Sequence, residues 1–335
     1  MIRLGTTFSG IGAIEHALHR MGEEHQIVFA GDIDEKCKET YFANYNINED
    51  EWHTDITKFD ATPYLNRVDL LVGGSPCQPF SYNGKRMGLE DTRGTLFNDY
   101  VRVIMQCQPK CFIFENVVGM LNQDKGRTWE IIKAAFKELN YEIHIQQDDN
   151  GNEQPLLNSA DYGVPQKRLR LFLVGIRNDL NLIQPFNFPK KQGLTRFVPD
   201  FLEEHVDAKY YLGQKGFEFV TTHPSRAQVG CPIMRCQKRI QQYNWNGDFI
   251  FEPLSKVKDI PQIMDRAYVS TWNGQVGVIR KFTPKECLRL MGFSDDFKII
   301  HSNDITMYNQ AGNSIVVDVL MALVNELIKT GIFRL

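Results

Sequence analysis

Phe8-Ser9-Gly10-Ile11-Gly12 is the stretch that decides the fold, because it separates a short apolar segment from the first amphipathic helix. Glycines at such a turn let the backbone approach a ligand at the N-terminus of a helix. The helix follows directly, with Ile11, Ile14, Leu18 and Met21 on one face. A strand, a glycine turn and a helix in this order predict the opening unit of a doubly wound α/β sheet.

The remainder of the first half continues the alternation of strands and helices. Short apolar runs predict buried strands at 27–30, 68–72, 111–114, 141–145 and 170–175. A second helical face follows the same period, with Trp129, Ile132, Phe136 and Leu139. This alternation predicts an α/β fold with a doubly wound, mostly parallel sheet covered by helices on both faces.

The alternation of predicted strands and helices stops near residue 186, where proline and glycine become frequent and the segments between them become short. We therefore expect a second, smaller domain of strands and loops that extends to about residue 275. Helical signals return at Thr283-Pro284, with proline in the first turn, and again at Val316, Leu320, Leu323 and Leu327.

Composition indicates a globular enzyme, with 42% hydrophobic and 24% charged residues and a net charge of -3. Residues 1–150 carry a balance of -8, whereas residues 151–335 carry +5, which suggests a polyanionic partner for the later half. Chance clustering of solvated charges explains the same asymmetry equally well. Seven cysteines, an odd number, predict free thiols in a reducing cytoplasm. We expect no signal peptide and no apolar run of membrane-spanning length.

The glycine turn predicts a nucleoside site of a particular kind. A dinucleotide fingerprint needs a third glycine where Glu15 stands, which argues against a nicotinamide oxidoreductase. Asp32 lies twenty residues past Gly12, after the second strand, where an acid accepts both hydroxyls of an adenosine ribose. Asp55-Ile56 then stands where it can read the adenine edge. Adenosine without a pyrophosphate indicates S-adenosylmethionine, although a glycine pair alone is also typical of an ordinary tight turn.

Reactive side chains follow the next strands of the predicted sheet. Cys77 comes directly after strand 68–72, although a single cysteine is more often a small buried hydrophobe. Glu115 ends strand 111–114, and Arg168 and Arg170 alternate at a strand start, so that we expect both to project to one side. Because carboxyl ends of parallel strands meet at one edge, these groups should share a crevice in which an arginine favours the thiolate.

Six motifs in this order resemble those of the bacterial cytosine-5 DNA methyltransferases of restriction–modification systems. They are Phe8-Ser9-Gly10-Ile11-Gly12, Ser75-Pro76-Cys77-Gln78, Glu115-Asn116-Val117, Gln166-Lys167-Arg168-Leu169-Arg170, Arg289-Leu290-Met291-Gly292-Phe293 and Gln310-Ala311-Gly312-Asn313-Ser314. The resemblance implies an S-adenosylmethionine-dependent methyltransferase fold with a catalytic domain over 1–190 and a target-recognition domain over 191–275. It also implies that 276–335 returns to the catalytic domain.

The same resemblance implies the roles of the site residues. Cys77 is the nucleophile that attacks carbon 6 of cytosine and thereby activates carbon 5. Glu115 relieves the charge at ring nitrogen 3, Arg170 holds the exocyclic oxygen, and Arg168 supports the site. The expected cofactor-binding residues are Phe8, Ser9, Gly10, Ile11, Gly12, Asp32, Ile33, Asp55, Ile56, Gly74, Pro76, Leu96, Asn313 and Ser314. The family commonly has Glu at position 32, a large aromatic at 33, and Pro or Phe at 75, whereas this chain has Asp, Ile and Ser.

Double-stranded DNA is the expected partner, with the target base flipped out of the duplex. The expected DNA contacts are Gln78, Ser81, Asn83, Lys85, Arg86, Arg93, Arg235 and Arg239. We expect no bound metal, no membrane association, no obligate protein partner and a monomeric enzyme. A cytosine-5 RNA methyltransferase acting on tRNA is the main alternative, and a non-catalytic DNA-binding module is a weaker one.

Overall fold

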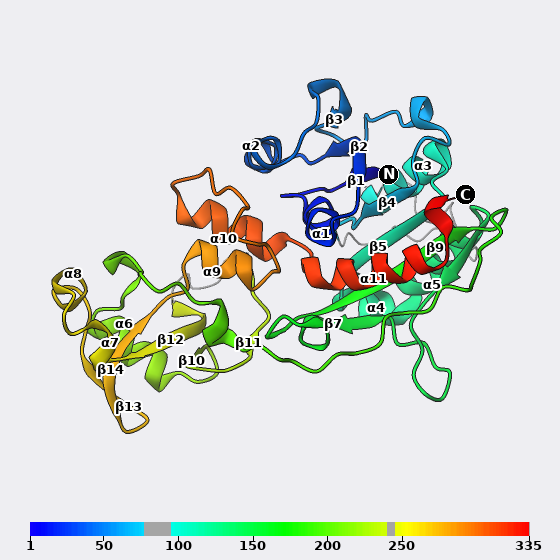
Figure 1. Ribbon diagram of the computed structural model, residues 1–335. Helices are drawn as coiled ribbons and strands as arrows, with labels where there is room; N and C mark the ends of the chain where they lie inside the picture. Colours follow the sequence, from blue (N-terminus) through cyan, green and yellow to red (C-terminus); the bar gives the residue numbers. More distant parts are fainter. Residues whose placement is uncertain (77–94, 240–244, 335) are drawn as a thin grey trace. The chain divides into compact units, whose positions relative to one another are not determined.

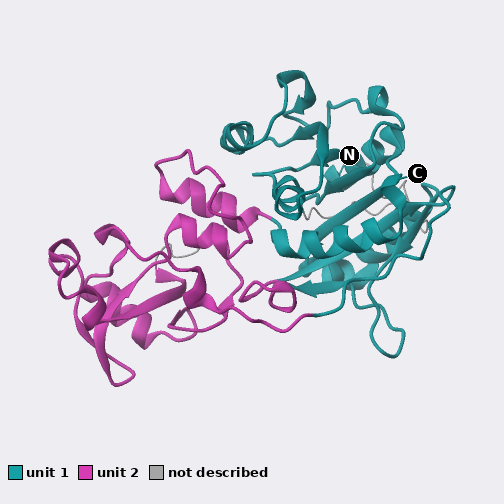
Figure 2. Cartoon of the chain, in the orientation of Figure 1, with its two compact units in different colours: residues 1–158, 169–191, 315–335 teal, residues 159–168, 192–314 magenta. Residues whose placement is uncertain are grey.

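The computed structural model describes residues 1–76, 95–239 and 245–334, which divide into two compact units (Figure 1). Unit 1 contains residues 1–158, 169–191 and 315–335, and unit 2 contains residues 159–168 and 192–314 (Figure 2). Because both units are discontinuous in sequence, the chain passes between them four times.

Unit 1 is built on a sheet that, among the described residues, has eight strands in the order β3-β2-β1-β4-β5-β9-β6, with β7 paired to β9. Strands β3, β2, β1, β4 and β5 are parallel, and β9 is antiparallel to β5, β6 and β7. The prediction of a doubly wound, mostly parallel sheet is confirmed. The strands are β1 (Ile2–Thr7), β2 (His25–Gly31), β3 (Trp52–His53), β4 (Leu70–Gly73), β5 (Cys111–Val117), β6 (Tyr141–His144), β7 (Leu156–Asn158) and β9 (Leu169–Arg177).

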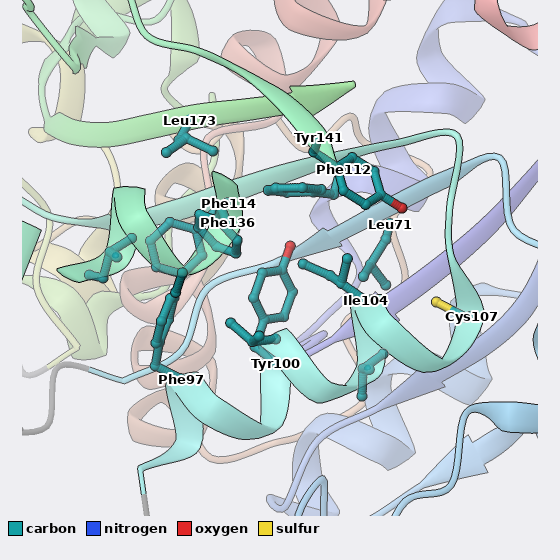
Figure 3. Packing of buried hydrophobic residues seen from close by; sticks show 14 of the residues in the cluster. Leu71, Phe97, Tyr100, Ile104, Cys107, Phe112, Phe114, Phe136, Tyr141 and Leu173 are labelled. Atoms are coloured by element: carbon teal, nitrogen blue, oxygen red, sulfur yellow. The ribbon is translucent and has the colours of Figure 1, made fainter. Parts of the chain in front are cut away.

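Helices of unit 1 enclose an aromatic core on this sheet (Figure 3). Phe112 of β5 lies 4.8 Å from Phe136, and Phe97 lies 5.3 Å from the same ring, measured between ring centroids. Tyr100 is fully buried, and its hydroxyl donates to the carbonyl of Ile113 at 3.2 Å. The α-helices are α1 (Ala13–Met21), α2 (Glu35–Asn44), α3 (Leu96–Cys107), α4 (Gly119–Asn122), α5 (Arg127–Lys137) and α11 (Val317–Lys329).

Unit 2 holds two small sheets. Strands β10 (Ala227–Val229), β12 (Gly247–Pro253), β14 (Gln275–Arg280) and β13 (Ser270–Trp272) form one in that order, and β8 (Gln166–Lys167) pairs with β11 (Met234–Arg235) in the other. The expectation of strands and loops alone over 186–275 is wrong, because α6 lies there with Phe217 and Val220 buried. The α-helices of unit 2 are α6 (Gln214–Thr222), α7 (Leu254–Val257), α8 (Pro261–Met264), α9 (Pro284–Arg289) and α10 (Asp304–Asn313).

The two units divide the chain differently from the predicted segments 1–190, 191–275 and 276–335. Residues 276–314 lie in unit 2, because β14 pairs with β12, and only 315–335 return to unit 1. Residues 159–168 also belong to unit 2, although they lie inside the predicted catalytic segment. The functional assignment of the segments remains a prediction.

One described stretch, residues 304–329, is long and apolar enough by composition to cross a membrane, contrary to the sequence expectation. It consists of two helices, since α10 ends at Asn313 and α11 begins at Val317. Just over half, 56%, of the apolar 18-residue window within this stretch is buried inside the protein. The apolar side of α11, including Leu320, Leu323 and Leu327, is buried as a core helix requires.

Arg280 joins three elements of unit 2 through a buried ion-pair network. Its guanidinium is fully buried and donates to Glu252 of β12 at 3.0 Å and to both carboxylate oxygens of Glu286 in α9 at 2.8 Å. Burial acts to raise the pKa of Glu252, but the charge of Arg280 holds that pKa below its ordinary value. Glu286 also closes a capping box with Thr283, which starts the predicted helix at Pro284.

Replacing Arg280 should therefore destabilise unit 2 strongly. In Arg280→Met the buried carboxylate of Glu286 loses its counter-charge, and that of Glu252 keeps only the half-exposed Lys256 at 2.8 Å. We expect a loss of about 3–5 kcal/mol in the free energy of unfolding. The control is Asp295→Asn, which breaks an exposed pair with Arg289 and should cost about 0–1 kcal/mol. Urea denaturation followed by circular dichroism measures both, and equal losses would contradict the assigned role of the network.

Candidate active site

The turn after β1 has the backbone conformation that its glycines predict. Phe8, Gly10 and Gly12 have φ values of 53°, 54° and 80°, in the left-handed region. A Cβ at Gly12 would lie 2.1 Å from the ring of Tyr45, whose hydroxyl donates to the Gly12 carbonyl at 2.7 Å. Only glycine fits at position 12, and the turn is held against α2.

Asp32 joins this turn to the end of β2. Its carboxylate accepts from the Gly10 N–H at 2.9 Å and from the Asp34 N–H at 3.0 Å. Burial raises the pKa of Asp32, while these two backbone hydrogen bonds oppose that shift. The carboxylate lies beside the glycine turn, as the spacing predicts.

A cavity of about 100 Å³ opens at the ends of β2, β3 and β4. Its lining combines two carboxylates with an apolar surface, and Ile33 is 77% exposed although it lies in this lining. A large exposed aliphatic side chain beside a carboxylate suits a flat ligand that has both an apolar face and hydroxyl groups. The lining residues are Phe8, Gly31, Asp32, Ile33, His53, Thr54, Asp55, Ile56, Pro76 and Leu96.

Seven residues predicted to bind the cofactor line this cavity, namely Phe8, Asp32, Ile33, Asp55, Ile56, Pro76 and Leu96. The predicted Ser9, Gly10, Ile11, Gly12 and Gly74 are absent from the lining, although they shape the adjoining turns. Asn313 and Ser314 belong to unit 2, so their closure of the cofactor pocket remains a prediction.

His53 is a lining residue that the sequence analysis missed. Burial lowers its pKa to about 4, so that the imidazole is neutral at physiological pH. Its ring stacks on Phe59 at 4.2 Å between centroids, and a Cβ at Gly31 would lie 2.1 Å from the His53 carbonyl oxygen. The pairing of β2 with β3 brings His53 here, and a two-residue strand leaves almost no periodic signal in the sequence.

Strands β4 and β5 form the other side of the site. A Cβ at Gly74 would lie 2.4 Å from the carbonyl oxygen of Glu115, so the two chain segments touch through glycine. Asn116 donates to the Ser75 carbonyl at 2.7 Å and fixes the main chain two residues before the predicted nucleophile. Cys77 itself lies outside the described residues.

Glu115 and Arg170 come together as the sequence predicts, with Nε of the arginine 3.3 Å from the carboxylate. The antiparallel pairing of β5 with β9 causes this contact, since Val117 is opposite Arg170. Both side chains are largely buried but still reach solvent. The pair offers one acidic group and one fixed cation at the carboxyl end of β5.

Arg168 does not share the environment of Arg170, and the expectation that both project to one side of a single strand is wrong. Arg168 precedes β9, belongs to unit 2 and is only 3% exposed. Its guanidinium donates to the carbonyls of Gln237, Gly312 and Ser314 at 2.8, 3.0 and 2.7 Å. The charged end of Arg168 is therefore hydrogen-bonded to three main-chain carbonyls of unit 2.

The two predicted DNA contacts among the described residues differ in their surroundings. Arg235 donates to the buried Asp248 at 2.6 Å and to the Gly247 carbonyl at 2.8 Å, so its guanidinium is engaged within unit 2. Arg239 is exposed. The predicted contacts outside the described residues are Gln78, Ser81, Asn83, Lys85, Arg86 and Arg93. Among the described residues, no three His, Cys, Asp or Glu side chains gather as metal ligands.

Sheet order, glycine turn and adjoining cavity define an S-adenosylmethionine-dependent methyltransferase fold. The chain belongs to the C-5 cytosine-specific DNA methylase family, whose model matches residues 2–329, and it is an enzyme of that type. The family resemblance expected from the six motifs is thus confirmed. Sequence relatives span nearly the whole chain. Type II methyltransferase M.HhaI of Haemophilus parahaemolyticus is 33% identical over 95% of this chain and 92% of its own, and orphan methyltransferase M.SPRI of Bacillus phage SPR is 29% identical over 99% and 98%.

Solved structures share the fold at lower identity. A mutant of DNMT2 from Spodoptera frugiperda superposes with a TM-score of 0.71 at 22% identity, covering 98% of this chain and 100% of its own. Dnmt2 of S. pombe gives 0.70 at 19% identity, covering 98% and 99%.

The steric role of Gly12 can be separated from its backbone role. Gly12→Ala adds a collision with Tyr45 to the cost of a left-handed backbone, whereas Gly10→Ala meets nothing within 4 Å and adds backbone strain alone. We expect Gly10→Ala to cost about 1–2 kcal/mol in the free energy of unfolding. Gly12→Ala should cost roughly 1–3 kcal/mol more, measured by urea denaturation. Equal costs would show that Tyr45 yields without strain.

A buried carboxyl group is linked to the glycine turn through the hydroxyl groups of two side chains. Glu15 of α1 is fully buried and accepts from the Tyr41 hydroxyl at 2.5 Å and the Thr6 hydroxyl at 3.1 Å. Thr6 lies 2.7 Å from the Ser9 hydroxyl, which accepts from the Gly31 N–H at 2.9 Å. Because Thr6 has one proton to give, Ser9 donates to Thr6, and a chain of hydrogen bonds runs from Gly31 to Glu15.

Burial raises the pKa of Glu15 to about 7, and this shift predicts a pH dependence of stability. The folded-state pKa exceeds the unfolded value near 4.5, so the contribution is complete below that pH and is lost as the pH rises through 7. Wild type should lose roughly 3 kcal/mol relative to Glu15→Gln between pH 4.5 and 8. The free energy of unfolding of both proteins is measured across this range, and the value for Glu15→Gln is subtracted from that of wild type. This subtraction cancels the titration of all groups that the two proteins share. Parallel pH profiles would refute the assignment.

Proposed function

We propose that this enzyme transfers a methyl group from S-adenosylmethionine to carbon 5 of a flipped-out cytosine in duplex DNA, with Cys77 as the nucleophile. The observation that carries the proposal is the continuity of the site. Pro76 lines the cavity beside the glycine turn, the next residue in the chain is the cysteine, and Gly74 touches the Glu115 main chain. Methyl donor, nucleophile and acid would therefore meet at one edge of the sheet.

The described residues fit the adenosine part of the proposed methyl donor. Asp32 offers a carboxylate to the two ribose hydroxyls, and Asp55 stands at the cavity as an acceptor for an adenine amino group. Ile33 would cover the face of the base, which accounts for an aliphatic side chain that is 77% exposed. When bound, S-adenosylmethionine supplies an electrophilic methyl group on sulfur.

The chemistry needs a nucleophile, an acid and a fixed cation. Attack of the Cys77 thiolate on carbon 6 breaks the 5,6 double bond and makes carbon 5 nucleophilic towards the methyl group. Glu115 would give a proton to ring nitrogen 3, while Arg170 would donate to the exocyclic oxygen. Loss of the carbon-5 proton to a base then restores the double bond and expels the thiolate, while ring nitrogen 3 returns its proton to Glu115. The Glu115–Arg170 contact at 3.3 Å supports the assignment of both groups to one base.

Flipping is needed because carbon 6 cannot be reached inside stacked DNA, at a cost of a few kcal/mol. We propose that unit 2 reads the sequence around the flipped base. The segment 78–94, predicted from its glycines and basic residues to close over that base, lies outside the described residues. The basic balance of residues 151–335 supports duplex DNA as the partner. The names of the relatives support a place in a restriction–modification system. A single chain holds every proposed group, which supports a monomer. Six described cysteines are free thiols, which supports a reducing cytoplasm as the location.

A DNA substrate with fluorine in place of the carbon-5 hydrogen tests the nucleophile directly. Fluorine cannot leave as a cation, so the thioether between protein and base should persist after methyl transfer. Denaturing gels of wild type should show a shifted band that requires S-adenosylmethionine, and Cys77→Ser should show none while still binding labelled S-adenosylmethionine.

Cys231→Ser is the matched control, because it removes a half-exposed thiol of unit 2 and should leave the band unchanged. A band that persists in Cys77→Ser would refute the nucleophile assignment. The DNMT2 structures share only the fold at 19–22% identity, so the tRNA alternative is best tested as a second substrate in the same assay. Trapping on tRNA alone would overturn the proposal for DNA.

A further inference from the structure

The segment 159–168 leaves the sheet of unit 1 and returns to it. Asn158 at the end of β7 pairs with Leu169 at the start of β9, so the two strands form a ladder, yet the ten residues between them belong to unit 2. In unit 2 this segment forms β8, which pairs in parallel with β11 through Gln166 opposite Met234 and Lys167 opposite Arg235. We call residues 159–168 the excursion, and its side chains make their contacts within unit 2.

The side chain of Gln166 binds the main-chain N–H of Gln237. Its amide is fully buried, and the side-chain oxygen accepts from the Gln237 N–H at 2.9 Å. The side-chain nitrogen donates to the Leu290 carbonyl at 2.8 Å. One side chain therefore joins the chain at 237 to the segment that follows α9.

The side chain of Arg168 binds the main-chain carbonyl of the same residue, Gln237. Its guanidinium donates to the Gln237 carbonyl at 2.8 Å and, through the second terminal nitrogen, to Gly312 and Ser314 at 3.0 and 2.7 Å. Both backbone polar groups of Gln237 are thus satisfied by side chains from the excursion. Because these bonds are buried, no water can replace them when a donor is removed.

Close packing reinforces this arrangement. A Cβ at Gly312 would lie 2.4 Å from the Arg239 nitrogen and 2.5 Å from the Lys238 carbonyl carbon, so the end of α10 touches the main chain of 238–239 directly. Lys238 and Arg239 both have exposed side chains on this anchored backbone. Two cations on a fixed main chain form a preorganised contact for a polyanion, since less conformational entropy is lost on binding.

We propose that Arg168 and Gln166 are positioning residues that clamp the main chain of the buried Gln237, and so hold the exposed Lys238 and Arg239 as a DNA-contacting surface of unit 2. This inference rests on the proposed DNA methyltransferase function. It assigns Arg168 a role within unit 2, where three carbonyls hold its guanidinium, in place of the predicted support of the cytosine site. Arg170, two residues further on, retains the role in the chemistry.

Steady-state kinetics on duplex DNA distinguish positioning from catalysis. In Arg168→Lys a single, shorter-reaching nitrogen replaces the two terminal nitrogens that bond Gln237 on one side and Gly312 and Ser314 on the other. We therefore expect KM for DNA to rise roughly tenfold while kcat changes less than about threefold. The preference for the methylated sequence, found by bisulfite sequencing, over a one-base variant should fall as well. Gln166→Met should behave alike, because it loosens the same residue from the opposite side. Arg170→Lys should show the reverse, with kcat lowered roughly a hundredfold and KM little changed.

Arg196→Lys is the matched control, an exposed guanidinium of unit 2 whose replacement should alter KM less than about twofold. Amide hydrogen exchange provides a readout that needs no activity. The amides of 237–239 should exchange faster in Arg168→Lys and Gln166→Met, while those of β1 and β4 keep their wild-type protection. Unchanged exchange at 237–239, or a fall in kcat without a rise in KM, would overturn the clamp. Faster exchange in an enzyme that methylates no DNA would instead overturn the proposed function.

Discussion

The pairing of β1 with both β2 and β4 is the constraint on which the rest of unit 1 depends. The chain runs outward from β1 through β2 to β3, then crosses to the other side for β4 and β5. Loops that leave the carboxyl ends of β1 and β4 must therefore diverge, and a crevice opens between them. Phe8 and Pro76, which line the cavity, stand at these two ends. The position of the site follows from strand order alone, before any side chain is considered.

Side chains then set how closely the crevice walls approach. Gly12 admits the ring of Tyr45, and Gly74 admits the main chain of Glu115, so both walls are backbone packed on a neighbour with no room for a Cβ. Beneath the first wall, the hydrogen bonds from Gly31 through Ser9 and Thr6 to Glu15 leave little freedom for the turn. Both walls are therefore rigid beside the cavity, which would reduce the ordering cost of binding a nucleoside there.

Sequence spacing predicted the parts of the site that lie at strand ends. Asp32 and the Glu115–Arg170 pair come from alternation and register, which leave periodic marks in the sequence. His53 could not be predicted, because its strand has two residues and its position depends on pairing with β2. The engagement of Arg235 by Asp248 and of Arg168 by Gly312 and Ser314 depends on tertiary contacts, which local patterns do not encode. Helix α6 was missed because Gly216 and its β-branched residues weaken the helical signal.

The fourfold passage of the chain between the units has a consequence for protein synthesis. Helix α11 packs on α1 in unit 1, yet the whole of unit 2 lies between them in the order of translation. A nascent chain that has emerged as far as residue 191 still lacks α11, so the side of α1 that packs against it stays uncovered while more than a hundred further residues are made. Unit 2 can close around residues 159–168 as soon as residue 314 is out. On the ribosome, the second unit therefore has its full complement of residues before the first, which is the opposite of the order in which the two begin.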